Sequence, residues 1–212
     1  MEEGMTRDPG YEVRRQQASE RKRLQVLKTA GYCFAETGFR KTTMASVAER
    51  AGVSKGLVFH FFGNKEALFK AVVEDGLRQW ATLSEYRASD AGAQGGTLAE
   101  LRSLFLASFD YIEQNPVLLL FDREDEGLTT MYRKQFARKN QLWRKRLQQA
   151  LKTGISQGDI RQVDVQRTAL LFHQLQAALL AAAIYKDSRP HYDRQALHLA
   201  IDIFLRGISM AR

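Results

Sequence analysis

The sequence has few of the residues that interrupt helices or cross-link chains. Among its 212 residues there are three Pro and one Cys, Cys33. Because Pro lacks a backbone donor and disrupts a helix interior, its scarcity favours long helices and predicts an all-α protein. A single Cys excludes an intrachain disulfide, which is typical of a reducing compartment and predicts a cytoplasmic protein.

Membrane-spanning, metal-binding and catalytic patterns are also missing. The longest apolar run, which follows Gln176, is too short to cross a bilayer, and the N-terminus has no apolar signal-peptide core. The four His are scattered, with no His-x-x-x-His pair and no Cys partner. The acidic residues at 122–126 have no Gly-rich phosphate loop or nucleophile beside them. We therefore predict no membrane association, no metal site, no cofactor and no enzymatic activity.

Positive charge is what the chain has in excess. Its formal net charge is +8, and residues 11–70 hold twelve Lys or Arg against five Asp or Glu, a net charge of +7. A basic surface attracts polyanions such as DNA, although net charge also serves solubility. The polar residues 1–17 are predicted to form a disordered basic arm, which either lies along phosphates or remains a solvated tail.

Apolar periodicity and capping residues predict about nine helices. In chain order they span 18–37, 44–51, 54–61, 65–85, 97–113, a segment from 116, 127–156, 165–185 and 191–210. Gly38 is expected to end the first helix, because Gly accepts a left-handed backbone without steric cost. Small residues predict a loop over 86–96, and Thr97 with Glu100 forms a capping-box pattern after it.

The second and third predicted helices have about two turns each and are joined by a tight turn, which is typical of a helix-turn-helix unit. The residues expected to pack this unit are Val47, Ala51, Gly52, Val53 and Phe62. The major groove of DNA admits one helix. The outer face of the third predicted helix, 54–61, is therefore expected to face bases. The base-facing residues on that face are Lys55, Gly56, Leu57 and His60.

Helix N-termini flank this outer face and predict phosphate contacts. Thr43, Ser54 and Lys65 each lie at the start of a helix, where exposed N–H groups favour anions. The alternative interpretation is that Thr43 is only a helix cap and that Lys65 is a solvated charge.

The run TTMASVAERAGVSKGLVFHFFGNKEALF, from Thr42 to Phe69, resembles the N-terminal DNA-binding domain of the TetR family of bacterial repressors. With the preceding helix, the resemblance extends over about residues 22–72. It implies a three-helix helix-turn-helix DNA-binding domain at 18–64 and a larger helical ligand-binding and dimerisation domain at 65–212. It also implies a homodimer on a double-stranded DNA operator with two half-sites, released by a small-molecule effector.

Three positions depart from the family pattern. Phe59 stands where Tyr is usual, so it lacks the hydroxyl that commonly meets a phosphate. Leu57 stands where Thr is usual, which predicts a different base preference. Gly31 replaces a usual Ala in the first helix, at a cost of about 0.5–1 kcal/mol of helix stability.

The last two predicted helices are apolar over more than one stripe, so each needs a second burial surface. The surface is either a partner subunit or an intrachain core. The candidates for a dimer interface are Leu171, Ala178, Ala182, Ile201 and Leu205. The candidates for an effector pocket are Trp80, Phe109, Tyr111, Phe121, Met131, Trp143, His173 and Gln174. This aromatic, mostly uncharged set favours an apolar or amphipathic effector, although Trp and a lone His are more often core residues.

The sequence as a whole predicts a ligand-responsive transcriptional regulator: a repressor that binds a palindromic operator as a homodimer. One alternative is a DNA-binding activator or architectural protein without an effector. Another is a ligand-binding protein that has lost DNA binding, which the departures at Leu57 and Phe59 leave open. An effect of a ligand on DNA binding separates the first alternative from the repressor.

Overall fold

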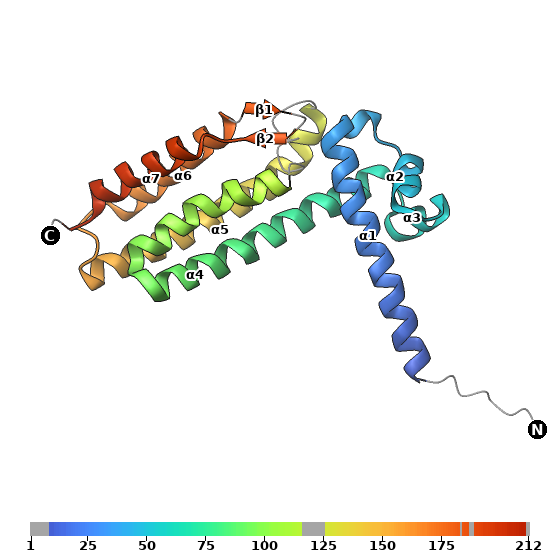
Figure 1. The fold of residues 1–212 in the computed structure, drawn as a ribbon, viewed down its shortest axis with the longest axis horizontal. Coiled ribbons are helices and arrows are strands. Elements are labelled where there is room, and N and C mark those ends of the chain that lie inside the picture. Colours follow the sequence, from blue (N-terminus) through green and yellow to red (C-terminus); the bar gives the residue numbers. More distant parts are fainter. Residues whose placement is uncertain (1–8, 116–125, 183, 187–188, 211–212) are drawn as a thin grey trace, which may run out of the picture. The chain divides into compact units, whose positions relative to one another are not determined.

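The computed structural model describes residues 9–115, 126–182, 184–186 and 189–210 (Figure 1). The elements in these ranges are α1 Pro9–Lys41, α2 Met44–Ala51, α3 Lys55–Phe62, α4 Lys65–Gln114, α5 Glu126–Gln157, α6 Val165–Ala181, β1 Ile184–Lys186, β2 Arg189–His191 and α7 Arg194–Ile208. The chain divides into two compact units, a first unit of Met1–Asp75 and a second unit of Gly76–Arg212. The prediction of an all-α fold is confirmed, apart from one antiparallel pair of three-residue strands.

The first helix is longer than predicted. It begins at Pro9, so residues 9–17 are helical and the predicted disordered arm is wrong for them, while residues 1–8 lie outside the described ranges. Pro is well suited to the first helical position, and the Arg, Gln and Glu that follow are good helix formers. Gly38 interrupts the helix with φ 80° and ψ 166°, as its position at the predicted end indicated.

The next two helices have nearly the predicted bounds, because local caps define their ends. Thr43 Oγ1 accepts a hydrogen bond from Ser46 N at 3.0 Å, and Ser46 Oγ accepts one from Thr43 N at 3.1 Å. Gly52 ends α2 in the left-handed region at φ 66° and ψ 33°. Ser54 Oγ then accepts a hydrogen bond from Leu57 N at 3.2 Å and caps α3.

The core of the first unit joins all four of its helices. Phe34 of α1 is fully buried, and its ring centroid lies 4.8 Å from that of Phe69 on α4. The predicted packing residues Val47, Ala51 and Phe62 are buried, whereas Val53 is half-buried and Gly52 is exposed in the turn. This packing fixes α2 and α3 against α1 and leaves the opposite side of α3 exposed.

Replacing Gly31 with Ala is expected to raise the free energy of unfolding by about 0.5–1 kcal/mol, because Ala restricts the unfolded chain. A Cβ at Gly31 would lie 3.5 Å from Val72 Cγ1, an ordinary van der Waals contact. Thermal denaturation followed by circular dichroism measures the change. Gly52→Ala is the matched control and should destabilise the protein, because φ at that position is +66°. A lower denaturation midpoint for Gly31→Ala would contradict the prediction.

The second unit contains the rest of α4 together with α5, α6, the hairpin and α7. Residues 86–95 are helical, so the predicted loop is wrong; the chain bends only at Gly96, where φ is 72°. Ala88 in this stretch is fully buried in the core, and that burial outweighs the weak helix propensity of the nearby Gly residues. Thr97 Oγ1 donates to Gln157 Oε1 at 3.1 Å and Glu100 pairs with Arg146, in place of the predicted capping box.

The last elements differ from the prediction at their ends. α6 ends at Ala181 instead of 185, and β1 and β2 form a short hairpin before α7. α7 begins at Arg194, because Asp193 accepts hydrogen bonds from Gln195 N and Ala196 N. The helix predicted from 116 starts outside the described residues. With α4 continuous through its bend, the described ranges contain seven helices against the predicted nine.

Candidate nucleic-acid interface and effector domain

The side chains of α3 divide between an exposed side and a buried side. Lys55, Gly56 and His60 are exposed and Leu57 is half-buried, whereas Val58 on the opposite side is fully buried. A Cβ at Gly56 would meet nothing within 4 Å, so packing inside the described protein does not require Gly there. The small residue therefore leaves space on the face that would approach a base edge.

Phe59 adds a large apolar ring to this face. Its side chain is 41% exposed, and Lys55 Nζ lies 5.7 Å from the ring centroid. An ammonium group over an aromatic face is held by a cation–π attraction. Phe59 therefore orients Lys55 on the outer face, although it has no hydroxyl to donate to a phosphate.

Thr43 and Ser54 are shown as helix caps. Each hydroxyl oxygen accepts a hydrogen bond from an N–H of the helix that follows it, and both residues are exposed. At Ser54 this arrangement uses the oxygen as an acceptor and leaves the hydroxyl proton available for a second partner, whereas Thr43 Oγ1 also donates to Ser46 Oγ at 3.2 Å. Their phosphate contacts stay predictions.

Lys65 has a structural role that the sequence did not indicate. Its Nζ donates to the carbonyl oxygens of Phe39 at 3.0 Å and Arg40 at 3.3 Å, and lies 4.4 Å from the centroid of the Phe39 ring. These carbonyl groups belong to the last turn of α1, where intrahelical partners are missing. The interpretation as a solvated charge is therefore wrong, and a phosphate contact stays a prediction that would use the remaining N–H.

Replacing Lys65 with Met is expected to lower the free energy of unfolding of the first unit by about 1–2 kcal/mol, because two charge-assisted hydrogen bonds are lost. Circular dichroism during urea denaturation measures this change. Lys70→Met is the control, since Lys70 is exposed and pairs only loosely with Glu74, at 3.8 Å. Unchanged stability together with a reduced salt dependence of DNA binding would contradict the structural role and favour the phosphate contact.

Two predicted pocket residues, Trp80 and Trp143, meet inside the second unit. Their ring centroids lie 4.8 Å apart. Trp80 Nε1 donates to Ser108 Oγ at 3.1 Å, and Trp143 Nε1 donates to Gln176 Oε1 at 3.2 Å. Each indole therefore has its polar atom satisfied within a mainly apolar core.

Other predicted pocket residues divide between core and surface. Phe109 is fully buried and Tyr111 is 4% exposed, so both are core residues. His173 is half-buried, and burial together with the charge of Arg144 lowers the pKa of its imidazole below the ordinary value. Phe121 lies outside the described residues, and of Met131 only the helical backbone is described.

Gln174 is exposed, so its prediction as an interior residue is wrong, and Gln176 occupies the interior instead. Gln176 is 4% exposed, and its Nε2 donates to the carbonyl oxygen of Phe105 at 2.9 Å and to Ser108 Oγ at 3.1 Å. Two residues along a helix turn the side chain by about 200°. In the sequence, Gln176 lies four residues after Phe172 and therefore on the same side of the helix, which was the signal that could have identified it.

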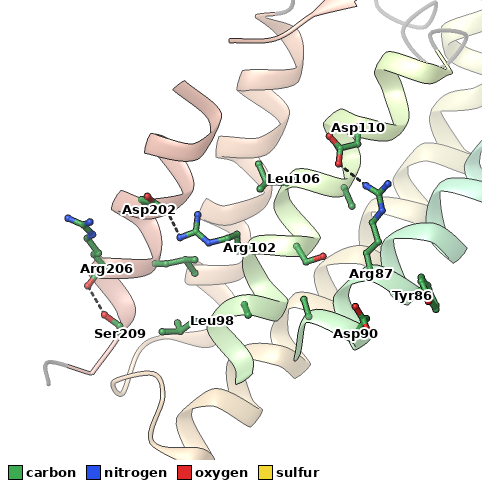
Figure 2. A pocket seen from close by; sticks show the side chains of 15 residues that line it. Tyr86, Arg87, Asp90, Leu98, Arg102, Leu106, Asp110, Asp202, Arg206 and Ser209 are labelled. Carbon is green, nitrogen blue, oxygen red and sulfur yellow. Dashed lines mark hydrogen bonds and ion pairs between the residues drawn. The ribbon is translucent and has the colours of Figure 1, made fainter. Parts of the chain in front are cut away.

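An open groove of about 740 Å³ lies elsewhere in the second unit, along α4 and α7 (Figure 2). Arg87 Nη1 lies 2.7 Å from Asp110 Oδ2 across it, and Arg102 pairs with Asp202. Its lining is Tyr86, Arg87, Asp90, Ala91, Leu98, Ala99, Arg102, Ser103, Leu106, Ala107, Asp110, Asp202, Leu205, Arg206 and Ser209. None of the predicted pocket residues is part of this lining, which combines apolar residues with six charged ones where a mostly uncharged pocket was expected.

The predicted dimer candidates on α6 are on the surface. Leu171 is 59% exposed, and Ala178 and Ala182 are also exposed. These side chains are available to a partner subunit, as a dimer interface requires.

The predicted dimer candidates on α7 are wrong. Ile201 is fully buried and Leu205 is 5% exposed, both in the core of the same chain. The exposed apolar residues of α7 are Leu199 at 60% and Ile203 at 63%, on the side opposite Ile201. The sequence shows that α7 has two apolar stripes, but the stripe that the chain itself buries depends on its packing against α6, where Phe172 meets Phe204.

Comparison with known proteins decides the family of the first unit. Residues 26–72 match the family model described as bacterial regulatory proteins, tetR family. This span contains α2, α3 and the parts of α1 and α4 that pack against them. Residues 26–72 thus form a TetR-family domain.

Regulators with this TetR-family domain are among the chain's relatives. It is 38% identical over 90 residues to the HTH-type transcriptional regulator BetI of Burkholderia thailandensis, over 42% of this chain and 45% of that protein. A BetI of Paraburkholderia xenovorans matches at 36% over 90 residues. The chain thus matches about half the length of these curated relatives.

Solved structures extend the likeness of the fold beyond the TetR-family domain. The ketosteroid transcriptional regulator KstR2 of Mycobacterium tuberculosis has a TM-score of 0.64 at 26% identity, covering 89% of this chain and 95% of that one. The structure of SmeT in complex with triclosan has a TM-score of 0.68 at 24% identity, covering 89% and 92%. The second unit therefore has the fold of the corresponding part of these proteins.

The described ranges were also searched for membrane-spanning helices and for metal-binding groups. No helix within them has the length and apolar character needed to cross a bilayer. Their His, Cys, Asp and Glu side chains form no group of three or more that could hold a metal ion.

Proposed function

We propose that the protein is a ligand-responsive transcriptional regulator, a repressor that binds a palindromic operator in double-stranded DNA. The observation that carries this proposal is the TetR-family helix-turn-helix, in which the outer face of α3 exposes Lys55, Gly56 and His60 while the inner face is packed. Such a helix lies in the major groove, where donors contact base edges. We expect it to act on DNA in the cytoplasm.

A homodimer is part of this proposal. Leu171 on α6 and Leu199 and Ile203 on α7 expose about 60% of their side chains. Burial of such residues against a second copy supplies the apolar area that a stable dimer needs. A two-fold axis then places the two α3 helices of the dimer on two half-sites about 34–36 Å apart, which is one turn of DNA.

A small apolar or amphipathic effector is the second partner. The interior of the second unit is built from large apolar and aromatic side chains, with Ser108 and Gln176 as polar groups. A protein of this fold, SmeT, has been solved with triclosan, so the fold is able to hold a small molecule of that size. An effector releases DNA only through its different affinity for the two states of the protein. Because α4 has residues in both units, we propose it as the coupling element.

Selection of random duplex DNA by the purified protein tests the proposal. A two-fold symmetric consensus is expected, with half-sites about one turn apart. Absence of any enriched sequence would contradict the proposal of a sequence-specific regulator. An asymmetric single site would contradict the proposal of a homodimer. Release of the selected duplex by apolar or amphipathic compounds is the second expected result. A symmetric operator that no such compound releases would indicate the alternative of an activator or architectural protein without an effector.

Replacing Lys55 with Ala is expected to weaken binding to the selected operator by about 1–3 kcal/mol per half-site, because a donor to a base edge is lost. Non-specific DNA should be bound almost as before. Fluorescence anisotropy with both duplexes measures the two affinities, and Lys70→Ala provides a control on an exposed Lys of α4. Equal weakening on both duplexes would show that Lys55 contacts the backbone and does not read a base.

A further inference from the structure

The N-terminal part of α1 extends beyond the core of the first unit. Residues 13–22 are all exposed, and the first fully buried residue of α1 is Val26. Figure 1 shows this part of the helix continuing past α2 and α3. At 1.5 Å per residue, residues 9–22 span about 21 Å. We call residues 9–22 the N-terminal arm.

Cations are gathered on one side of the N-terminal arm. Arg14 and Arg21 are seven residues apart, as are Arg15 and Lys22, so each pair recurs on nearly the same side of the helix. At 100° per residue the four cations fall within an arc of about 120°. Glu20, which pairs with Arg23 at 3.2 Å, lies outside that arc, as does the other acid of the arm. Arg15 pairs with Glu12 at 3.9 Å, and the arm thus has a cationic face of four side chains.

The root of the N-terminal arm is fixed beside the helix-turn-helix. Gln25 Nε2 donates to the carbonyl oxygen of Ala51 at 2.8 Å, at the end of α2. Arg23 Cζ lies 5.5 Å from the ring centroid of Phe62, at the end of α3. Because both contacts hold α1 at the base of the arm, the arm's position is coupled to that of α3.

The N-terminal arm has little to stabilise it within the chain. Its large apolar side chains, Tyr11 and Val13, are 55% and 53% exposed, so the arm gains little from burial, and side-chain pairs along it contribute only a few tenths of a kcal/mol each. A polyanion beside the cationic face would supply the missing stabilisation. DNA is the polyanion that α3 is proposed to approach, and Arg23 at the arm's root contacts Phe62 at the end of α3.

We propose that the N-terminal arm lies along the phosphate backbone of the DNA that flanks each half-site. This inference rests on the proposed function of the helix-turn-helix. Its contacts are with phosphates, so they add affinity without sequence preference. With 3.4 Å per base pair, an arm of about 21 Å reaches about six base pairs. We therefore expect the protein to contact a length of duplex that extends beyond the two half-sites.

The test uses the full chain with four substitutions in the arm, Arg14→Gln, Arg15→Gln, Arg21→Gln and Lys22→Gln. The matched control removes the same charge from exposed residues of the second unit, through Arg78→Gln, Lys145→Gln, Lys152→Gln and Arg161→Gln. Two duplexes carry the selected operator. One ends at the outer edges of the half-sites, and the other extends about ten base pairs further on each side, one helical turn. Fluorescence anisotropy over a series of KCl concentrations gives the affinities.

The wild type and the control variant are expected to bind the longer duplex at least about tenfold more tightly at low salt. The plot of log affinity against log salt concentration should be steeper on the longer duplex by about 0.9 for each phosphate contacted. The arm variant should lose both differences and bind the shorter duplex as the wild type does. Circular dichroism checks that its fold is retained, which the exposure of all four residues predicts.

Three results would overturn the inference and are distinguishable from one another. If the arm variant keeps the preference for the longer duplex with an unchanged salt slope, the arm does not contact DNA, while the regulator proposal stands. If the wild type binds neither duplex above its affinity for random DNA, the proposed function fails and the arm proposal fails with it. Equal loss in the arm and control variants would show that net charge, and not the arm, supplies the affinity.

Discussion

Replacing Ile203 with Glu is expected to convert the proposed homodimer into a monomer at micromolar protein concentration. Ile203 is 63% exposed on α7, four residues after Leu199, which is 60% exposed. Neither side chain contributes to the core of its own chain, because Ile201 and Leu205 fill that role from the opposite side of the helix. The face of Leu199 and Ile203 is therefore the part of α7 that a second copy would cover.

The size of the effect follows from charge burial and symmetry. In a two-fold dimer the same surface is used twice, so one substitution places two carboxylates in the interface. A carboxylate buried without a partner costs several kcal/mol, and each 1.4 kcal/mol changes a dissociation constant tenfold. We expect the dimer dissociation constant to rise by about a hundredfold or more.

Sedimentation velocity over a range of concentrations measures the change, and Leu142→Glu is the matched control. Leu142 is 60% exposed on α5, so the same charge is introduced at an equally exposed apolar residue outside α6 and α7. The control is expected to remain dimeric. A dimer that survives Ile203→Glu, or one that only Leu142→Glu dissociates, would place the interface elsewhere. The monomeric variant should also lose most of its operator affinity, because a single α3 contacts only one half-site.

The parts of the fold that the sequence predicts well depend on short-range chemistry. Thr43, Gly52 and Ser54 define the helix-turn-helix, because each cap or turn is completed by residues at most four positions away. The outer face of α3 follows once those ends are known. The same short-range reasoning places Gly38 at the end of the first predicted helix, where α1 bends.

The predictions are wrong where contacts between residues far apart in the sequence determine the structure. Residues 86–95 contain several small residues, yet they are helical because Ala88 is buried against the core of the second unit. A phosphate contact was predicted for Lys65 from its position at a helix start. In the structure its ammonium group contacts carbonyl groups 25 and 26 residues earlier in the chain. Ile201 and Ile203 are chemically alike, and only the packing of α7 shows which one faces the core.

Replacing Gln176 with Ala is expected to lower the free energy of unfolding of the second unit by about 2–4 kcal/mol. Gln176 Oε1 accepts the hydrogen bond from Trp143 Nε1, and Nε2 donates to Ser108 Oγ and to the carbonyl oxygen of Phe105. Without the amide, the indole N–H of Trp143 is left buried without this acceptor. The shorter side chain also leaves a space in the core that its neighbours fill only in part.

Tryptophan emission measures this change in the second unit alone. The chain has two Trp, Trp80 and Trp143, and both lie in that unit with their rings 4.8 Å apart. Gln174→Ala is the matched control, because Gln174 is exposed two residues away on the same helix and its loss should leave the denaturation midpoint unchanged. If the two variants unfold at the same midpoint as the wild type, the hydrogen bonds of Gln176 do not stabilise the core. If Gln176→Ala instead stays folded and shifts only the response to an effector, the amide serves recognition, and the interior around the two indoles is then the effector site.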